Sequence, residues 1–150
     1  LATIVTPNLP EAGDLLGRVV TDAPSDMRMA ARELHGRGAQ AALVKGGHGT
    51  GERLTDVMFD GERFVELAAR RQQTRNTHGT GCTFSSAIAA LLPQRDSIES
   101  AVRDAHTYVH AAIRAADTLV VGSGHGPLHH FHALWPHGVR GTDPETRLQP

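Results

Sequence analysis

Two short uncharged segments near the start of the chain, separated by helical sequence, restrict the fold more than any other pattern. Residues 2–6 (ATIVT) have the composition of a buried strand that ends at Pro7, because proline cannot donate to a strand ladder. Residues 41–44 (AALV) form a second such run. Strand, helix and strand in this order predict a parallel pair joined by a right-handed crossover, and therefore an α/β sheet.

The segment between these strands is expected to hold two helices. Asn8 and Glu11 suit a variant of the capping box at the start of the first. The second is expected over 27–35, opened by Ser25 or Asp26, because its apolar residues recur at helical spacing. Both helices would cross back over the sheet that the two strands begin.

The rest of the chain predicts a hairpin followed by two helices. Alternating runs on either side of Asp60-Gly61 indicate antiparallel strands over 55–59 and 63–67. A glycine-containing turn leads into a helix expected over 83–92. Apolar residues at helical spacing then predict a long helix after Ser97, its expected N-cap.

The length of 150 residues suits one folded domain. We expect residues 1–137 to be the folded part and residues 138–150 to be a disordered tail. The chain begins at Leu1 without a methionine and enters a strand almost at once. We therefore expect that the N-terminal part of a larger domain precedes it.

Composition excludes several classes of function. Lys and Arg total 15 against 16 Asp and Glu, so the chain lacks the basic excess that nucleic-acid binding requires. It has no run of about 18 apolar residues that would span a bilayer, so no membrane partner is expected. Cys82, the single cysteine, cannot form an internal disulfide, which favours a reducing, cytoplasmic location.

The strongest chemical signal is Gly79-Thr80-Gly81-Cys82, placed immediately before a helix. Glycines let backbone N–H groups converge, and a helix N-terminus attracts anions. A thiol in this position is also expected to have a lowered pKa, which would make Cys82 a base or a nucleophile. The alternative is a tight turn with a buried, inert cysteine.

Two further segments have residues suited to phosphate chemistry. Lys45 ends a strand and enters Gly46 and Gly47, where its ammonium would meet a phosphate as a point charge. Neither the P-loop nor the dinucleotide fingerprint is present. Asn8 and Glu11 follow a strand and have oxygen ligands suited to magnesium. The alternatives are a solvated lysine and simple helix capping.

Two other kinds of site are less consistent with the sequence. The histidines at 125, 129, 130 and 132 suggest zinc, but no cysteine or carboxylate lies nearby to complete a tetrahedral set. A hydrolase dyad of Cys82 and His78 would need two residues on opposite sides of a glycine turn to face each other.

Four stretches, taken together, resemble a known family. These are TPNLPEA at 6–12, LVKGGH at 43–48, NTHGTGCTFSSAIAA at 76–90 and GHGPLHH at 124–130. In this order they are similar to the hydroxymethylpyrimidine/phosphomethylpyrimidine kinases of thiamine biosynthesis, within the ribokinase-like superfamily. The similarity extends from Ile4 to Leu134. It implies the C-terminal, nucleotide-binding part of a ribokinase-like three-layer sandwich, from which the N-terminal half is absent.

The resemblance also implies an activity. A kinase of this family moves the γ-phosphoryl group of ATP, with Mg²⁺, onto the hydroxymethyl pyrimidine and then onto its monophosphate. Such kinases are usually cytoplasmic homodimers that act on a small molecule. The resemblance implies that Asn8 and Glu11 bind magnesium and that Gly79, Thr80 and Gly81 form an anion hole. It implies a catalytic role for Cys82, at the position where most of the superfamily has an aspartate. Lys45, Gly46 and Gly47 would contact the ATP phosphates, and Thr77 would shape the adenine side.

Two alternatives follow from the same residues. A pyridoxal or pyridoxine kinase would use the same scaffold, because the residues that would decide the substrate are not in this chain. A truncated, non-catalytic module would keep nucleotide binding without turnover.

Overall fold

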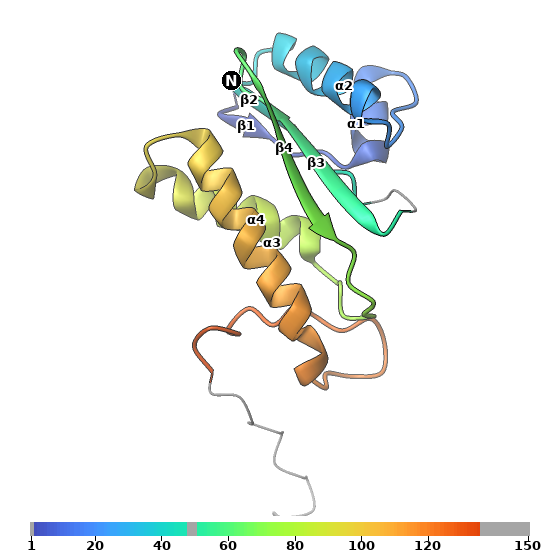
Figure 1. The fold of residues 1–150 in the computed structure, drawn as a ribbon, viewed down its shortest axis with the longest axis vertical. Helices are drawn as coiled ribbons and strands as arrows, with labels where there is room; N and C mark the ends of the chain where they lie inside the picture. The colour runs from blue at the N-terminus through green and yellow to red at the C-terminus, as the bar shows by residue number, and fades with distance from the viewer. Residues whose placement is uncertain (1, 48–50, 136–150) are drawn as a thin grey trace, which may run out of the picture.

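The computed structural model describes residues 2–47 and 51–135, which form a mixed sheet with helices on both faces (Figure 1). The four strands of this sheet lie in the order β1-β2-β3-β4. The strands are β1 (Ile4–Val5), β2 (Ala41–Val44), β3 (Arg53–Phe59) and β4 (Phe64–Arg70); the helices are α1 (Leu9–Leu16), α2 (Pro24–Gly36), α3 (Thr80–Leu91) and α4 (Ile98–Ala115), with short 3₁₀ turns η1 (Leu92–Gln94) and η2 (Ala116–Thr118).

The sheet combines the two kinds of pairing that the sequence predicts. β1 and β2 are parallel, with Ile4 opposite Ala41, which confirms the α/β crossover. β3 and β4 form the predicted antiparallel hairpin, and β3 also pairs antiparallel with β2, with Leu43 opposite Met58. β1 is therefore joined to the hairpin through β2, whose four residues are all buried.

The core lies in two layers, one on each face of the sheet. Leu43 and Met58 point toward α3 and α4 and pack with Phe84 and Ile88. Their neighbours along the strands face α1 and α2 instead, where Val57 joins the second cluster. Each fully buried side chain of this size contributes about 1.5–3 kcal/mol to folding. The helix–sheet–helix arrangement is the expected three-layer α/β sandwich (Figure 1).

The start of α2 differs from the prediction. Ala23 is the N-cap and makes no side-chain capping bond, while Pro24 occupies the first turn. Asp26 lies inside that turn, where its carboxylate accepts the Thr21 N–H at 2.7 Å and pairs with Arg18 at 2.7 Å. The prediction that Ser25 or Asp26 opens this helix was wrong, because the fixed φ of proline suits the first helical position.

α3 also begins earlier than the sequence predicts. It starts at Thr80 instead of Thr83, so Gly81 and Cys82 belong to its first turn. Gly79 is the N-cap and has a φ of 81°, a left-handed conformation that favours glycine. The glycine turn and the helix are thus one continuous structure.

The tail expected at 138–150 lies outside the described residues. Among the helices that the structure describes, none combines the length and apolar character required to cross a bilayer.

Candidate active site

A cleft of about 900 Å³ lies where the ends of β1 and β2, the hairpin, the start of α3 and the second half of α4 come together. It joins segments that are more than 70 residues apart in the chain. Gly46 does not line it, because this residue is buried behind the cleft surface. The other predicted site residues all line the cleft: Asn8, Glu11, Lys45, Gly47, Thr77, Gly79, Thr80, Gly81 and Cys82.

Lys45 and the first turn of α3 meet at one end of the cleft. The Lys45 Nζ atom lies 3.2 Å from the position that a Cβ atom on Gly81 would occupy. Glycine at this position therefore allows the ammonium to approach the helix backbone. Lys45 is the single lysine in a chain with 14 arginines. Its compact ammonium suits this close contact better than a planar guanidinium would.

The first turn of α3 is well placed to attract an anion. The Thr83 N–H donates to the Gly79 carbonyl at 2.8 Å, the first intrahelical bond. The amides of Gly81 and Cys82 precede that bond, and such amides at a helix N-terminus attract negative charge. Thr80 steadies the turn, because its hydroxyl donates to the Thr77 carbonyl at 2.8 Å.

Two hydroxyl groups that the sequence did not indicate connect β1 to α3. The Ser85 hydroxyl donates to the Gly81 carbonyl at 3.1 Å and lies 2.8 Å from the Thr6 hydroxyl. Since Ser85 has one hydroxyl proton, Thr6 donates to Ser85. Both side chains line the cleft. Thr6 and Ser85 are 79 residues apart in the sequence, so no local pattern indicated their contact.

Asn8 and Glu11 make a reciprocal capping box at the start of α1. The Asn8 N–H donates to Glu11 Oε2 at 2.8 Å, and the Glu11 N–H donates to Asn8 Oδ1 at 2.9 Å. Both residues also face the cleft, and Asn8 forms a β-bridge with Lys45. The capping alternative is therefore present in the structure, at the position where the sequence also predicts a metal.

Protein ligands by themselves do not build a metal cage in the described parts of the chain. No group of three or more His, Cys, Asp or Glu side chains is arranged there to hold an ion. The histidines at 125, 129, 130 and 132 fall within this region, so the zinc hypothesis gains no support.

Asp56 on β3 is a cleft residue that the sequence analysis missed. Its carboxylate accepts the Gly46 N–H at 2.9 Å. Burial raises the pKa of Asp56 to about 6, although the Gly46 N–H and the Lys45 ammonium both act to lower it. In the sequence Asp56 is one polar residue within an expected strand. Only the packing of β3 beside Lys45 shows that it lines the cleft.

The other end of the cleft is apolar and contains two histidines of α4 whose ring planes are tilted by 56° to each other. His106 and His110 have ring centroids 4.4 Å apart and lie one helical turn from each other. Burial lowers the pKa of both, that of His110 to about 4, and the nearby charges of His106 and Arg114 lower the His110 pKa further. The apolar lining comes from Leu54, Leu67, Phe84, Val109 and Ile113.

We expect His110 to make the protein less stable in mild acid. The unfolded chain binds a proton to this histidine more readily than the folded protein does, so stability falls as the pH drops from 6.5 toward 4. In the intact gene product, His110→Gln should reduce the loss of unfolding free energy between pH 7 and pH 5 by about 1 kcal/mol, measured by denaturant titration. Exposed His130→Gln is the control, and an unchanged pH slope in His110→Gln would contradict the assignment.

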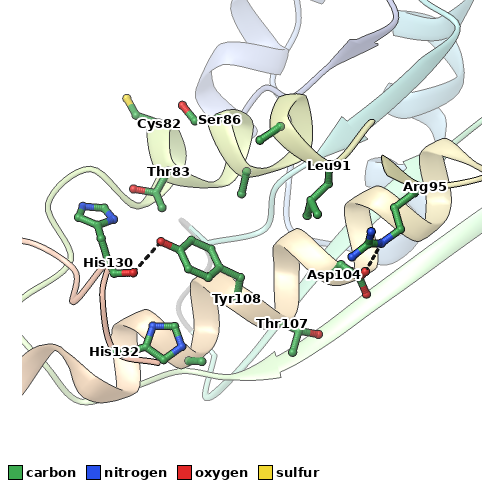
Figure 2. Close-up of a pocket in the computed structure, with 13 residues that line it drawn as sticks. Cys82, Thr83, Ser86, Leu91, Arg95, Asp104, Thr107, Tyr108, His130 and His132 are labelled. Atoms are coloured by element: carbon green, nitrogen blue, oxygen red, sulfur yellow. Dashed lines mark hydrogen bonds and ion pairs between the residues drawn. The ribbon is translucent and has the colours of Figure 1, made fainter. Parts of the chain in front are cut away.

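A second, more open groove of about 830 Å³ runs along the outer surfaces of α3 and α4 (Figure 2). Tyr108 lies across it and donates from its hydroxyl to the His130 carbonyl at 3.0 Å. At one end Arg95 pairs with Asp104 at 2.6 Å. Cys82 is exposed and lines both this groove and the cleft. Its thiol is therefore accessible where the two cavities meet.

The phosphomethylpyrimidine kinase family model matches residues 1–129. The chain belongs to the phosphomethylpyrimidine kinase family. This confirms the resemblance drawn from the four sequence stretches.

Individual relatives agree with this assignment. The hydroxymethylpyrimidine/phosphomethylpyrimidine kinase of Rhizobium meliloti is 50% identical over 135 residues, 90% of this chain and 51% of the relative. That of Escherichia coli is 44% identical over 133 residues, 89% of this chain and 50% of the relative. The chain therefore spans about half the length of the curated relatives that it matches.

Solved structures share the fold of this family member. The pyridoxal kinase from Staphylococcus aureus in complex with AMP-PCP superposes with a TM-score of 0.82 at 35% sequence identity. The match covers 89% of this chain and 48% of that chain. The α/β sandwich expected from the sequence is thus that of kinases in this superfamily.

Proposed function

We propose that this chain supplies the nucleotide-binding half of an active site that phosphorylates 4-amino-5-hydroxymethyl-2-methylpyrimidine and then its monophosphate, with ATP as donor. The observation that carries the proposal is the contact between the Lys45 ammonium and Gly81, beside Cys82 at the start of α3. Family membership and the activity named for the curated relatives support the same function.

The phosphate end of the cleft has the groups that phosphoryl transfer requires. The reaction depends on positioning and on neutralising negative charge. Lys45 supplies a positive charge, and the amides of Gly81 and Cys82 supply donors at a helix N-terminus. Gly79, Thr80 and Gly81 are assigned to the anion hole, and Gly47 lets the chain pass close to the nucleotide.

Cys82 is assigned to the proton transfer. The acceptor oxygen forms a bond to the γ-phosphorus while the bond from the γ-phosphorus to the β,γ-bridging oxygen breaks, which releases ADP. The proton of the acceptor hydroxyl passes to the Cys82 sulfur, which takes part as a thiolate and becomes a thiol. In a loose transition state this transfer is late, so the demand on the base is modest. In the second phosphorylation the acceptor is a phosphate oxygen.

Glu11 and Asn8 are the residues that would hold magnesium. Glu11 is exposed at the cleft, and a carboxylate oxygen is a ligand that Mg²⁺ prefers. Because no cage of three protein ligands exists in the described residues, the donor set fits an ion that keeps waters and phosphate oxygens as its remaining ligands. When bound, such an ion neutralises charge on the phosphates.

The apolar end of the cleft is assigned to the adenine. Leu54, Val109 and Ile113 provide a surface of the kind that buries an aromatic base. Thr77 lines the same cleft and is assigned to shaping the adenine side. We also infer a cytoplasmic homodimer, as the resemblance to this family implies.

A pyridoxal kinase is the second candidate, because the pyridoxal kinase from Staphylococcus aureus has the same fold at 35% identity. The test is to incubate the intact gene product with ATP, magnesium and each of three acceptors: the hydroxymethyl pyrimidine, its monophosphate and pyridoxal. Mass spectrometry identifies the product. We expect the pyrimidine diphosphate. Pyridoxal phosphate as the sole product would favour the second candidate, and ATP binding without any product would favour a non-catalytic module.

A further inference from the structure

Asp56 and Lys45 face each other across two antiparallel strands. The register of β2 and β3 places Val44 opposite Val57. Continued by one residue, it places Lys45 opposite Asp56, on the face that Leu43 and Met58 turn toward α3 and α4. Opposite charges in directly opposed positions attract one another. Asp56 therefore lies beside the residue whose ammonium contacts α3.

Asp56 also holds the residue that follows Lys45. Its Oδ1 atom accepts the Gly46 N–H at 2.9 Å. Gly46 lies so close to β3 that a Cβ atom there would be 2.1 Å from the Thr55 carbonyl oxygen. The carboxylate and the close backbone approach thus fix the chain against β3 immediately after Lys45.

The same segment is held from β1 as well. The Lys45 N–H donates to the Pro7 carbonyl at 2.9 Å, and Lys45 forms a bridge with Asn8. From a backbone held on both sides, the side chain extends to within contact of Gly81. The position of the ammonium therefore depends on how firmly the 45–47 segment is held.

We propose that Asp56 is a positioning residue for the phosphate end of the cleft. Its carboxylate holds the 45–47 segment on β3 through the Gly46 N–H, and this keeps the Lys45 ammonium over the first turn of α3. This rests on the proposed function, in which that end of the cleft receives the ATP phosphates. A carboxylate with raised pKa is costly to keep in a strand, and locally unfavourable residues of this kind concentrate at functional sites. Asp56 acts through Lys45 and does not touch the phosphates itself.

Asp56→Ala and Asp56→Asn, made in the intact gene product, separate the hydrogen bond from the charge. Alanine removes the acceptor, whereas asparagine keeps an oxygen at the same position. Titration calorimetry should give an ATP Kd at least 10-fold weaker for Asp56→Ala. Asp56→Asn should lie within about threefold of wild type, because an amide oxygen accepts the same N–H. The KM for the acceptor should change less than twofold in both variants.

The controls make the result decisive. Glu66→Gln removes a carboxylate from the same hairpin on the opposite face, where Glu66 pairs with Arg28, and should leave the ATP Kd unchanged. If Asp56→Ala does not fold, Asp56→Val replaces it, since an apolar side chain of similar volume is well tolerated in a strand. Wild-type ATP affinity in Asp56→Ala or Asp56→Val, or equal loss in Asp56→Asn, would overturn the positioning role alone. Absence of ATP binding by the wild-type protein would overturn the proposed function together with it.

Discussion

Cys82→Ala is expected to lower kcat of the intact gene product by about 10²–10⁴-fold while leaving the Kd for ATP within about twofold, because a positioned base contributes a factor of this size. The thiol is exposed where the cleft and the outer groove meet, in the first turn of α3. Removing it takes away the proposed proton acceptor but leaves Lys45 and the helix amides in place. Rapid-quench kinetics and titration calorimetry measure the two effects separately.

Ser86→Ala is the matched control for this experiment. Ser86 is exposed one turn further along the same side of α3 and also lines both cavities. It should therefore retain close to wild-type kcat. Cys82→Asp places a carboxylate at the same helix position and should recover part of the lost rate. If Cys82→Ala turned over at the wild-type rate, Cys82 would have no part in the chemistry.

Lys45→Met is expected to reduce kcat/KM for ATP by about 10²–10³-fold, the range found when one donor to a developing charge is removed. Methionine keeps most of the length and apolar stem of lysine but has no charge. Since the ammonium approaches Gly81 closely, the loss should appear in both ATP affinity and kcat. Steady-state kinetics with varied ATP and calorimetric ATP binding measure it.

Lys45→Arg and Arg53→Met complete this comparison. Arginine restores the charge, but its guanidinium is too broad for the space against Gly81, so we expect less than 10% of wild-type kcat/KM. Arg53 is an exposed cation at the start of β3 that does not line the cleft, and its replacement should have little effect. Full activity in Lys45→Arg would show that charge alone is sufficient, without the close contact.

Local chemistry made much of the fold predictable. The α1 capping box at Asn8 and Glu11 depends on residues three positions apart, and both its hydrogen bonds are present. Ser97 caps α4 for the same reason. The hairpin around Asp60-Gly61 formed as its alternating pattern indicates, because turn geometry and strand period act over a few residues. Errors came at helix starts, where the preference of Pro24 for a first turn prevailed over the capping preference of Asp26.

The separate segments of the candidate site were equally visible in the sequence. Lys45 with its glycines and the turn at Gly79 each carry a local pattern that suits phosphate chemistry. These patterns do not show how far apart the segments lie in the folded protein. The resemblance to a kinase family implied that they belong to one site, and the family match confirmed the resemblance.

The sequence by itself therefore determined the type of each helix and strand, the caps at Asn8 and Ser97, and the local patterns at Lys45 and Gly79 that suit phosphate chemistry, because these depend on residues a few positions apart. Only the tertiary structure decided which of them meet. Lys45 against Gly81, Thr6 with Ser85, and Asp56 on the Gly46 amide are contacts across the sheet and between layers. Their geometry follows from how β2 pairs with β3 and how α3 packs on the sheet, which depends on burial of the whole core and not on any local pattern.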